Sequence, residues 1–310
     1  MRIFENPNYN FIQWRWHALG VSALVLVAGL GLAVTRGLPL GIDFTGGTIV
    51  VLKFQQPVGE DSLRRALDAV SGEKVVQQFG DAEANEWLVR LSELTTEDGA
   101  ALEQGARAVV DAVTAGGFGQ FEVINQELVG PVIGRDLQLK GIYATLASLV
   151  GITIYIGLRF RFAFAIGAVI ATFHDILVTL AFLVFFGYDL SLNIVAAILT
   201  IAGYSVNDTI VIFDRVRENL RSRRRDSLEA VVNASVNQTL GRTVITSGTT
   251  FAAVLSLYLF GGQVLEGFAF TMLVGIISGT YSTVFIAAAL AIVLSGRQAA
   301  GRTQTARKAS

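Results

Sequence analysis

Ionisable side chains within long apolar segments are the residues of this sequence that could do chemistry. Asp208 lies in Gly203-Tyr-Ser-Val-Asn-Asp-Thr209, a few apolar residues before a charged stretch. An ionisable group in a membrane is costly unless it is paired or hydrated, so Asp208 is a functional candidate. On a helix, Tyr204 and Ser205 share its face. This polar face indicates a hydrated path or a partner helix; the alternative is an aspartate close enough to the membrane surface to be solvated.

Arg242 is the cationic candidate, in Gly241-Arg-Thr-Val-Ile-Thr-Ser-Gly-Thr-Thr250 at the start of the fifth apolar segment. Helical spacing places Thr246 and Thr249 on the same face as Arg242, with Ser247 and Thr250 beside it. Its position alone favours an ordinary arginine whose side chain extends to the membrane surface. The polar face below it and Asp208 on the preceding segment favour a functional role instead.

His174 and Asp175 are neighbours deep in the third apolar segment. Such a pair could relay protons, because imidazole titrates near neutral pH. It could equally form a hydrogen-bonded lock between helices. Tyr204 and Asn207 are candidates for the same relay or lock. Because the chain has two histidines and no cysteine, a His-based metal site, disulfides and thiolate catalysis are not expected.

Long membrane-spanning helices must position these groups. Hydrophobic residues make up 52% of the chain and charged residues 16%, whereas about 25% of an ordinary soluble domain is charged. A span needs roughly 20 apolar residues. Six spans are predicted, at Ala18–Thr35, Leu139–Leu158, Phe162–Phe186, Leu190–Phe213, Val244–Phe260 and Phe268–Leu294. The first has no small-residue cleavage site after it and is interpreted as an uncleaved anchor. Gly275 and Gly279 in the sixth predict close helix packing.

The short connections between spans predict the orientation of the chain. Basic residues are concentrated after the second, fourth and sixth spans, and the connections 187–189 and 261–267 contain none. Because Lys and Arg are enriched in cytoplasmic loops, both termini are predicted to be cytoplasmic, in a multi-pass protein of the bacterial inner membrane. Residues 36–140 are then predicted to lie outside the cytoplasm. The net charge of −1 does not indicate a nucleic-acid partner.

The region between the first two spans has the pattern of a small α+β domain. Strands are predicted at Ile42–Phe54, Lys74–Phe79, Glu86–Leu91 and Gln120–Leu128, and helices at Glu60–Val70 and Glu97–Val113. The order βαββαβ is ferredoxin-like. The predicted organisation is an N-terminus with the first helix (1–36), an extracytoplasmic ferredoxin-like domain (37–138), a five-helix membrane region (139–296) and a cytoplasmic tail (297–310).

Three motifs together resemble the SecD/SecF family of protein translocase subunits. Gly41-Ile-Asp-Phe-Thr-Gly-Gly-Thr48 is similar to the family signature that follows the first span. The stretch 203–219 resembles the fourth-span motif in its SecF form, and the stretch 242–250 resembles the fifth-span motif. The resemblance covers nearly the whole chain, and the small external domain favours the SecF group.

The resemblance implies a fold and a function. The fold is a six-helix half of a resistance-nodulation-division (RND) type unit, in which SecF pairs with SecD. That unit assists the SecYEG channel and uses the proton-motive force to pull preproteins outward after the ATP-driven insertion by SecA. YajC is a further candidate partner, and the membrane lipid surrounds the spans. Protons are the coupling ion, and no cofactor is expected.

The resemblance also assigns roles to particular residues. It places proton transfer on Asp208 and Arg242, with a further acidic residue donated by SecD. The turn formed by Asp43, Phe44, Thr45, Gly46 and Gly47 is predicted to couple the first span to the external domain. The alternative is a strand-entry turn in which the glycines supply unusual dihedral angles.

Three other interpretations stay open. A different RND-type exporter is one, and co-purification of a SecD-like partner would distinguish it. An intramembrane aspartyl protease built from Asp175 and Asp208 is the second; its chemistry needs a carboxyl dyad, but the usual Gly-x-Gly-Asp context is absent. A passive scaffold of the channel without proton chemistry is the third. The expectation is a transport protein and not an enzyme.

Overall fold

The computed structural model describes residues 7–80, 82–92 and 99–296. The chain divides into two compact units. The membrane unit comprises Met1–Leu38, Thr145–Tyr188 and Asn193–Ser310, and the sheet unit comprises Pro39–Ala144 and Asp189–Leu192. The predicted tail 297–310 and the first residues of the helix predicted at Glu97–Val113 lie outside the described residues.

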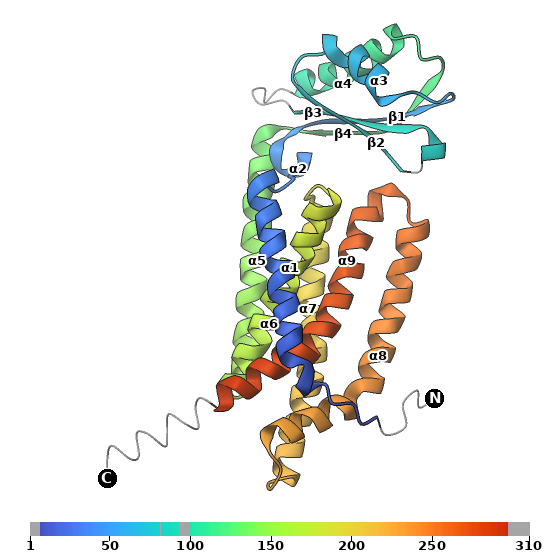
Figure 1. Ribbon diagram of the computed structural model, residues 1–310. Coiled ribbons are helices and arrows are strands. Elements are labelled where there is room, and N and C mark those ends of the chain that lie inside the picture. The colour runs from blue at the N-terminus through green and yellow to red at the C-terminus, as the bar shows by residue number, and fades with distance from the viewer. Residues whose placement is uncertain (1–6, 81, 93–98, 297–310) are drawn as a thin grey trace. The chain divides into compact units, whose positions relative to one another are not determined.

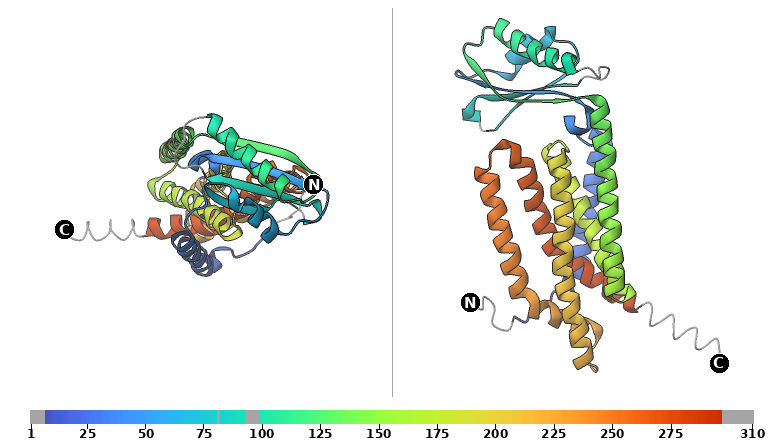
Figure 2. Two further views of the ribbon diagram at one scale, coloured as in Figure 1. Left: turned by 90° about the horizontal axis from the view of Figure 1, so that it is seen from above. Right: turned by 180° about the vertical axis from the view of Figure 1, so that it is seen from behind.

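Six described helices are long and apolar enough to cross a membrane, as the hydropathy of the sequence predicts. They run side by side in Figures 1 and 2. Their bounds are α1 (Arg15–Arg36), α5 (Pro131–Arg159), α6 (Phe162–Phe186), α7 (Leu192–Ser222), α8 (Leu228–Phe260) and α9 (Gln263–Ser282). A π-helical turn, Thr283–Ala287, follows α9, and the sixth span continues to Gly296.

Helix α8 begins well before the predicted start of its span at Val244. Its first half is amphipathic, with Val231, Val232 and Val236 buried, so this half forms a helix by packing and not by crossing the membrane. Ser227 is the N-cap of this helix, and its hydroxyl accepts a hydrogen bond from the Ala230 N–H at 3.2 Å. Arg242, predicted to open a span, therefore lies in the interior of a long helix.

Close packing of α9 against α7 confirms the role predicted for the two glycines of the sixth span. A Cβ atom at Gly275 would lie 2.2 Å from Ile201 Cδ1, and one at Gly279 would lie 3.1 Å from Ser205 Cβ. A side chain at Gly275 would therefore collide with α7. The close approach lets serines of both helices, Ser205 of α7 and Ser278 and Ser282 of α9, reach one side chain of α6, Asp175.

The sheet unit has the predicted ferredoxin-like order. Its elements are α2 (Ile42–Thr45), β1 (Gly47–Phe54), α3 (Glu60–Ala66), β2 (Glu73–Gln78), β3 (Glu86–Ser92), α4 (Gly99–Ala115) and β4 (Phe121–Val129). The strands pair antiparallel in the order β2-β3-β1-β4. Helices α3 and α4 cover one face of the sheet (Figure 1). The core between them is apolar and includes Leu52, Leu63, Val89 and Val109.

The strand predicted at Ile42–Phe54 is wrong in its first part. Residues Ile42–Thr45 form one helical turn, α2, and the strand begins at Gly47. Ile42 and Phe44 are both buried, so they imitate the alternation of a strand although the chain turns between them. Gly46 has φ +73° and Gly47 has φ +134°, which L side chains rarely adopt, and this pair redirects the chain into β1.

Candidate functional site

Asp175 of α6 is fully buried and hydrogen-bonded on both carboxylate oxygens. Oδ2 accepts from Ser205 Oγ at 2.5 Å and from Ser282 Oγ at 2.7 Å. Oδ1 accepts from Ser278 Oγ at 2.8 Å and lies 3.1 Å from His174 Nδ1. The hydroxyls come from α7 and α9, so one carboxylate joins three helices. This geometry favours the interhelical lock over the proton relay.

His174 packs between Asp175 and Tyr281. Its Nε2 atom is buried and has no hydrogen-bond partner among the described residues. Its ring stacks on Tyr281 with centroids 6.3 Å apart. The Tyr281 hydroxyl donates to the Ala18 carbonyl of α1 at 2.7 Å. His174 therefore packs between Asp175 and Tyr281, whose hydroxyl is hydrogen-bonded to α1. This arrangement is typical of a packing residue.

Asp208 of α7 is also buried, with 4% of its surface exposed, but it is held much more weakly. Its one side-chain hydrogen bond among the described residues comes from Ser247 Oγ of α8 at 3.2 Å. Ser247 in turn accepts from Thr280 Oγ1 of α9 at 2.9 Å. A short chain of hydroxyls thus leads from α9 to the Asp208 carboxyl group, which keeps capacity for water or for a proton.

Arg242 is exposed and makes no ion pair with any residue that the structure describes. It interacts electrostatically with Asp208 without a direct contact. The buried polar residues of this part of α8 are Thr243 and Ser247, and Ser247 lies beside the predicted face of Arg242, Thr246 and Thr249.

The other two predicted relay residues do not join either carboxylate. Tyr204 is partly buried, and its hydroxyl has no hydrogen-bond partner among the described residues. Asn207 is exposed on α7. Asp175 and Asp208 are not hydrogen-bonded to each other, and each accepts from a different set of hydroxyl groups. They do not form the carboxyl dyad that an aspartyl protease requires.

Sequence reasoning placed Ser205 with Asp208, whereas its hydroxyl donates to Asp175, and it missed the two serines of α9. Ser278 and Ser282 are four residues apart in the sequence and therefore share a face of α9. That spacing is the one signal that could have found them. The π-helical turn begins directly after Ser282, and π-helical turns are frequent at functional sites. Its Thr283 Oγ1 lies 3.0 Å from Thr209 Oγ1 of α7.

The predicted coupling turn lies in the sheet unit and holds the residues that lead into α7. The backbone N–H of Leu192, the first residue of α7, donates to Asp43 Oδ2 at 2.8 Å. Leu190 N donates to the Pro39 carbonyl, and Gly41 N donates to the Leu190 carbonyl, each at 2.7 Å. Asp43 therefore caps α7, the helix that carries Asp208.

An ion pair strengthens this attachment. Arg90 of β3 donates to Asp189 Oδ2 at 2.7 Å, and its side chain is only 14% exposed. Burial raises the pKa of the Asp189 carboxyl group, and the Arg90 charge and hydrogen bond oppose that rise. This ion pair could not be predicted, because its members are 99 residues apart along the chain.

The remaining residues of the coupling turn are packing residues. Phe44 is buried, and the Thr45 hydroxyl donates to the Gly41 carbonyl at 3.2 Å. A Cβ atom at Gly46 would lie 2.7 Å from Pro131 Cα, at the first residue of α5. The turn thus contacts the first residues of α5 and α7, Pro131 and Leu192.

Six spanning helices and an inserted ferredoxin-like sheet define a multi-pass membrane protein with an α+β domain. The family model for the protein export membrane protein SecD/SecF, C-terminal, matches residues 109–297. The model for the SecD/SecF GG motif matches residues 31–58, which include Gly46 and Gly47. The chain belongs to the SecD/SecF family.

Curated relatives place it with the SecF group. Protein translocase subunit SecF of Desulfurispirillum indicum is 44% identical over 91% of this chain and 90% of the relative. The subunit of Rhodothermus marinus is 42% identical over 97% and 98% of the two chains. The subunit of Escherichia coli O157:H7 is 41% identical over 92% and 88%. The resemblance seen in the sequence motifs is thereby confirmed.

Solved structures agree with this assignment. The chain is similar to SecDF of Thermus thermophilus, a translocon-associated membrane protein, with a TM-score of 0.82 and 34% identity over 94% of this chain. A second structure, SecDF in a super-membrane-facing form, gives a TM-score of 0.71 at 34% identity. The chain spans 39% of the first SecDF chain and 41% of the second.

Proposed function

We propose that this chain pairs with SecD and uses the proton-motive force to assist preprotein translocation through SecYEG. Asp208 carries the proton in this proposal, and Arg242 responds to its charge. The observation that carries the proposal is the contrast between two buried carboxyl groups. Among the residues that the structure describes, Asp175 has four hydrogen-bonding contacts and Asp208 has one, at 3.2 Å.

This contrast favours a structural role for Asp175 and a role in proton transfer for Asp208. A carboxylate surrounded by donors is stabilised in its place, and a change of its charge would break contacts among three helices. A buried carboxyl group with one long hydrogen bond is different, because its charge depends on hydration and on nearby cations. In this proposal Asp208 gains and loses a proton with small local rearrangement, and Asp175 holds α6, α7 and α9 together.

The path of α7 supports coupling of that proton to movement. Asp208 and the capped N-terminal residue Leu192 belong to one continuous helix. One charge that crosses the membrane potential is worth about 2.3 kcal/mol per 100 mV. A displacement of α7 linked to protonation would be transmitted through the backbone to the residues held by Asp43.

The exposed faces of α7 and α8 suit a partner in the membrane. Gly203 and Asn207 of α7 are exposed, as are Arg242 and Gly248 of α8. Small and polar residues of this kind let a neighbouring helix approach closely. We propose that SecD covers this face and supplies the further acidic residue opposite Arg242. SecYEG and YajC are proposed as partners of the assembled unit.

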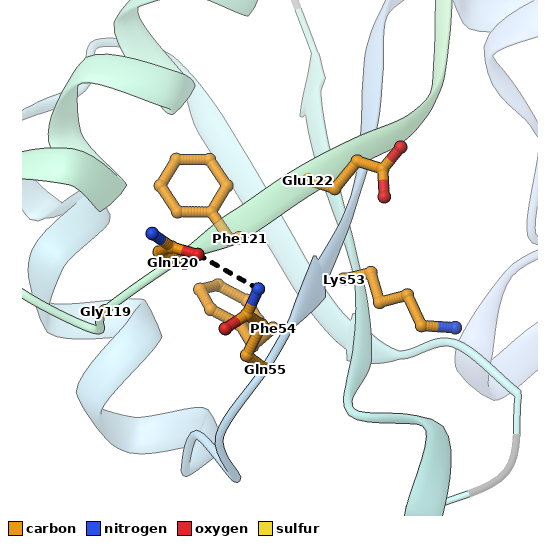
Figure 3. A pocket seen from close by; sticks show the side chains of 7 residues that line it. All are labelled: Lys53, Phe54, Gln55, Gly119, Gln120, Phe121 and Glu122. Carbon is orange, nitrogen blue, oxygen red and sulfur yellow. Dashed lines mark hydrogen bonds between the residues drawn. The ribbon is translucent and has the colours of Figure 1, made fainter.

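Strand β4 is the proposed contact for preprotein. It lies at the edge of the sheet and pairs with β1 alone, and its Val123, Ile124 and Leu128 are exposed. A cavity of about 480 Å³ adjoins its first residues, with Phe121 and Gln120 on one side and Lys53 near the other (Figure 3). An extended chain could pair with the free edge of β4.

The proposed cellular location and orientation of the protein rest on the distribution of its basic residues. Basic residues lie after the second and fourth spans, at Arg159, Arg161 and in the stretch 215–225. We therefore assign these ends, and both termini, to the cytoplasm of a bacterium whose inner membrane holds the protein. The sheet unit then faces the compartment that receives exported chains.

The experiment compares export with and without a proton gradient at matched expression. Asp208→Asn keeps size and hydrogen bonding but cannot exchange a proton at physiological pH. Arg242→Ala removes the cation, and Arg242→Lys keeps charge without the planar fork. Asp226→Asn, which alters a surface carboxylate at the connection between α7 and α8, is the matched control. We expect loss of gradient-dependent export in the first two, an intermediate result for lysine, and parental export in the control.

Co-purification of SecD in the same samples separates the competing explanations. Parental gradient-dependent export by Asp208→Asn would favour the passive scaffold. Loss of SecD from Asp208→Asn and Arg242→Ala would identify an assembly contact instead of a proton carrier. Recovery of native complexes that contain no SecD or SecYEG would favour another RND-type exporter.

A further inference from the structure

A second pocket in the membrane unit contains no residue used by the proposed proton mechanism. It lies where α5 ends and α6 begins, beside the second half of α7, and has a volume of about 340 Å³. It is lined by three arginines and a group of apolar side chains: Arg159, Phe160, Arg161, Phe164, Phe213, Val216, Arg217 and Leu220.

Aromatic rings form the base of this pocket, which we call the arginine pocket. Phe213 is 1% exposed, and its ring packs edge-on against Phe164 at 5.1 Å and against Phe160 at 5.8 Å. Val216 beside it is fully buried. The base is therefore preformed and apolar, and it is suited to hydrocarbon more than to a hydrated ion.

The rim of the arginine pocket carries unneutralised positive charge. Arg159 is paired with Asp214 at 2.8 Å. Arg161 and Arg217 are exposed and make no ion pair or side-chain hydrogen bond with any residue that the structure describes. No acidic residue lines the pocket. Two free guanidinium groups thus remain beside an apolar cavity.

The position of these charges matches the membrane surface. Arg159 is the last residue of the second span, and Arg161 directly precedes the third. The first turn of α6 also has no side-chain cap at Arg161, so its backbone N–H groups add a favourable site for an anion. Arg159 and Arg161 therefore lie at the ends of two spans, where headgroups are expected, and the aromatic rings line the same pocket.

We propose that the arginine pocket binds one anionic phospholipid, with the phosphodiester between Arg161 and Arg217 and an acyl chain along the phenylalanine base. Guanidinium groups match phosphate oxygens with paired hydrogen bonds. Basic pockets between membrane helices are suited to anionic headgroups. A free phosphate would use the rim and leave the apolar base empty, so the lipid fits both halves of the site.

The test measures which lipids stay bound to the purified full-length chain. The protein is exchanged into nanodiscs with equal phosphatidylglycerol and phosphatidylcholine, released, and the retained lipids are counted by native mass spectrometry. Arg161→Gln with Arg217→Gln removes the rim charge. Arg224→Gln with Arg225→Gln removes equal charge from the connection after α7, outside the pocket. We expect retained phosphatidylglycerol to fall about tenfold in the first double variant and to stay parental in the second.

Three outcomes would overturn the proposal. Equal loss in both double variants would show attraction by net charge without a site. Unchanged retention in Arg161→Gln with Arg217→Gln would show that the pocket does not select the lipid. A third arm adds inorganic phosphate: displacement of phosphatidylglycerol at millimolar phosphate would identify an anion site without a lipid. Thermal unfolding of each variant, expected to match the parent, excludes a folding defect as the cause.

Discussion

Replacement of Asp175 with alanine should loosen the membrane unit far more than the same replacement at Asp208. The Asp175 carboxylate contacts hydroxyl groups of α7 and α9 and the neighbouring imidazole. Asp208 has one contact, with Ser247 of α8. If Asp175 joins the helices and Asp208 carries the proton, Asp175→Ala should lower stability and Asp208→Ala should impair transport.

The expected magnitudes follow from the number of contacts. A hydrogen bond between membrane helices contributes about 0.6 kcal/mol on average. The three contacts of Asp175 with hydroxyls of α7 and α9 then contribute roughly 1.8 kcal/mol, and the one contact of Asp208 with Ser247 of α8 about 0.6 kcal/mol. The freed hydroxyls limit the loss, because Ser282 Oγ can keep its bond to the Gly279 carbonyl, now 3.2 Å.

The assay is the free energy of unfolding of the purified protein in bicelles, with each variant at the same protein and lipid concentration. Asp175→Asn is the intermediate case, because an amide oxygen still accepts and serine hydroxyls can turn to accept from its NH₂ group. A loss below about 1 kcal/mol for Asp175→Ala, or an equal loss for Asp208→Ala, would refute the assignment of Asp175 as the lock.

Three further predictions concern the sheet unit. Asp43→Ala should destabilise the first turn of α7 by about 1 kcal/mol, with Asp43→Asn close to the parent; hydrogen exchange of that turn measures it, and equal exchange in both variants would contradict the cap. The raised pKa of Asp189 means that the folded chain keeps a proton which the unfolded chain releases, so stability should fall as pH rises from about 4 through the raised pKa. Arg90→Gln removes the cation that lowers the pKa of Asp189, so the loss of stability, measured by thermal unfolding, should extend to higher pH. An unchanged pH profile would argue against the ion pair of Arg90 and Asp189. Gly46→Ala should cost about 1–3 kcal/mol because of its positive φ and its contact with α5, whereas Gly59→Ala, which meets nothing within 4 Å, should be nearly neutral in the same thermal assay; similar losses in both would contradict the packing of the turn.

The membrane helices could be predicted from the sequence because hydrocarbon imposes a minimum apolar length. Hydropathy therefore found all six spans but placed the start of α8 at Val244, since it detects only the part that crosses the membrane. The earlier part is helical because Val231 and Val236 pack into the bundle. This contact depends on tertiary structure, and a hydropathy window contains no signal for it.

The sheet was predicted because its strands alternate between a buried and an exposed face. Trp87, Val89 and Leu91 of β3 are buried in this alternation. The same rule failed at Ile42 and Phe44, because two buried residues separated by one fit both a strand and a single helical turn. The glycine pair that follows was the signal for a change of direction.

The candidate site could be predicted only in part. Asp175 and Asp208 were identifiable as ionisable residues in apolar segments, but nothing local distinguishes them. Their difference depends on hydroxyl groups of other helices, above all Ser278 and Ser282 of α9, which the fold brings to one carboxylate only. Spacing on α8 identified Ser247 beside the face of Arg242, but its contact with Asp208 depends on the packing of α7 against α8.

Proton uptake by reconstituted protein tests the central claim most directly. The chain is co-reconstituted with SecD in vesicles, a potential is imposed, and proton entry is followed with a pH-sensitive dye trapped inside. If Asp208 carries the proton, the parent should take up protons and Asp208→Asn should not. Asp175→Asn should still take up protons after correction for the amount of folded protein. Parental uptake by Asp208→Asn, or loss confined to Asp175→Asn, would contradict the account.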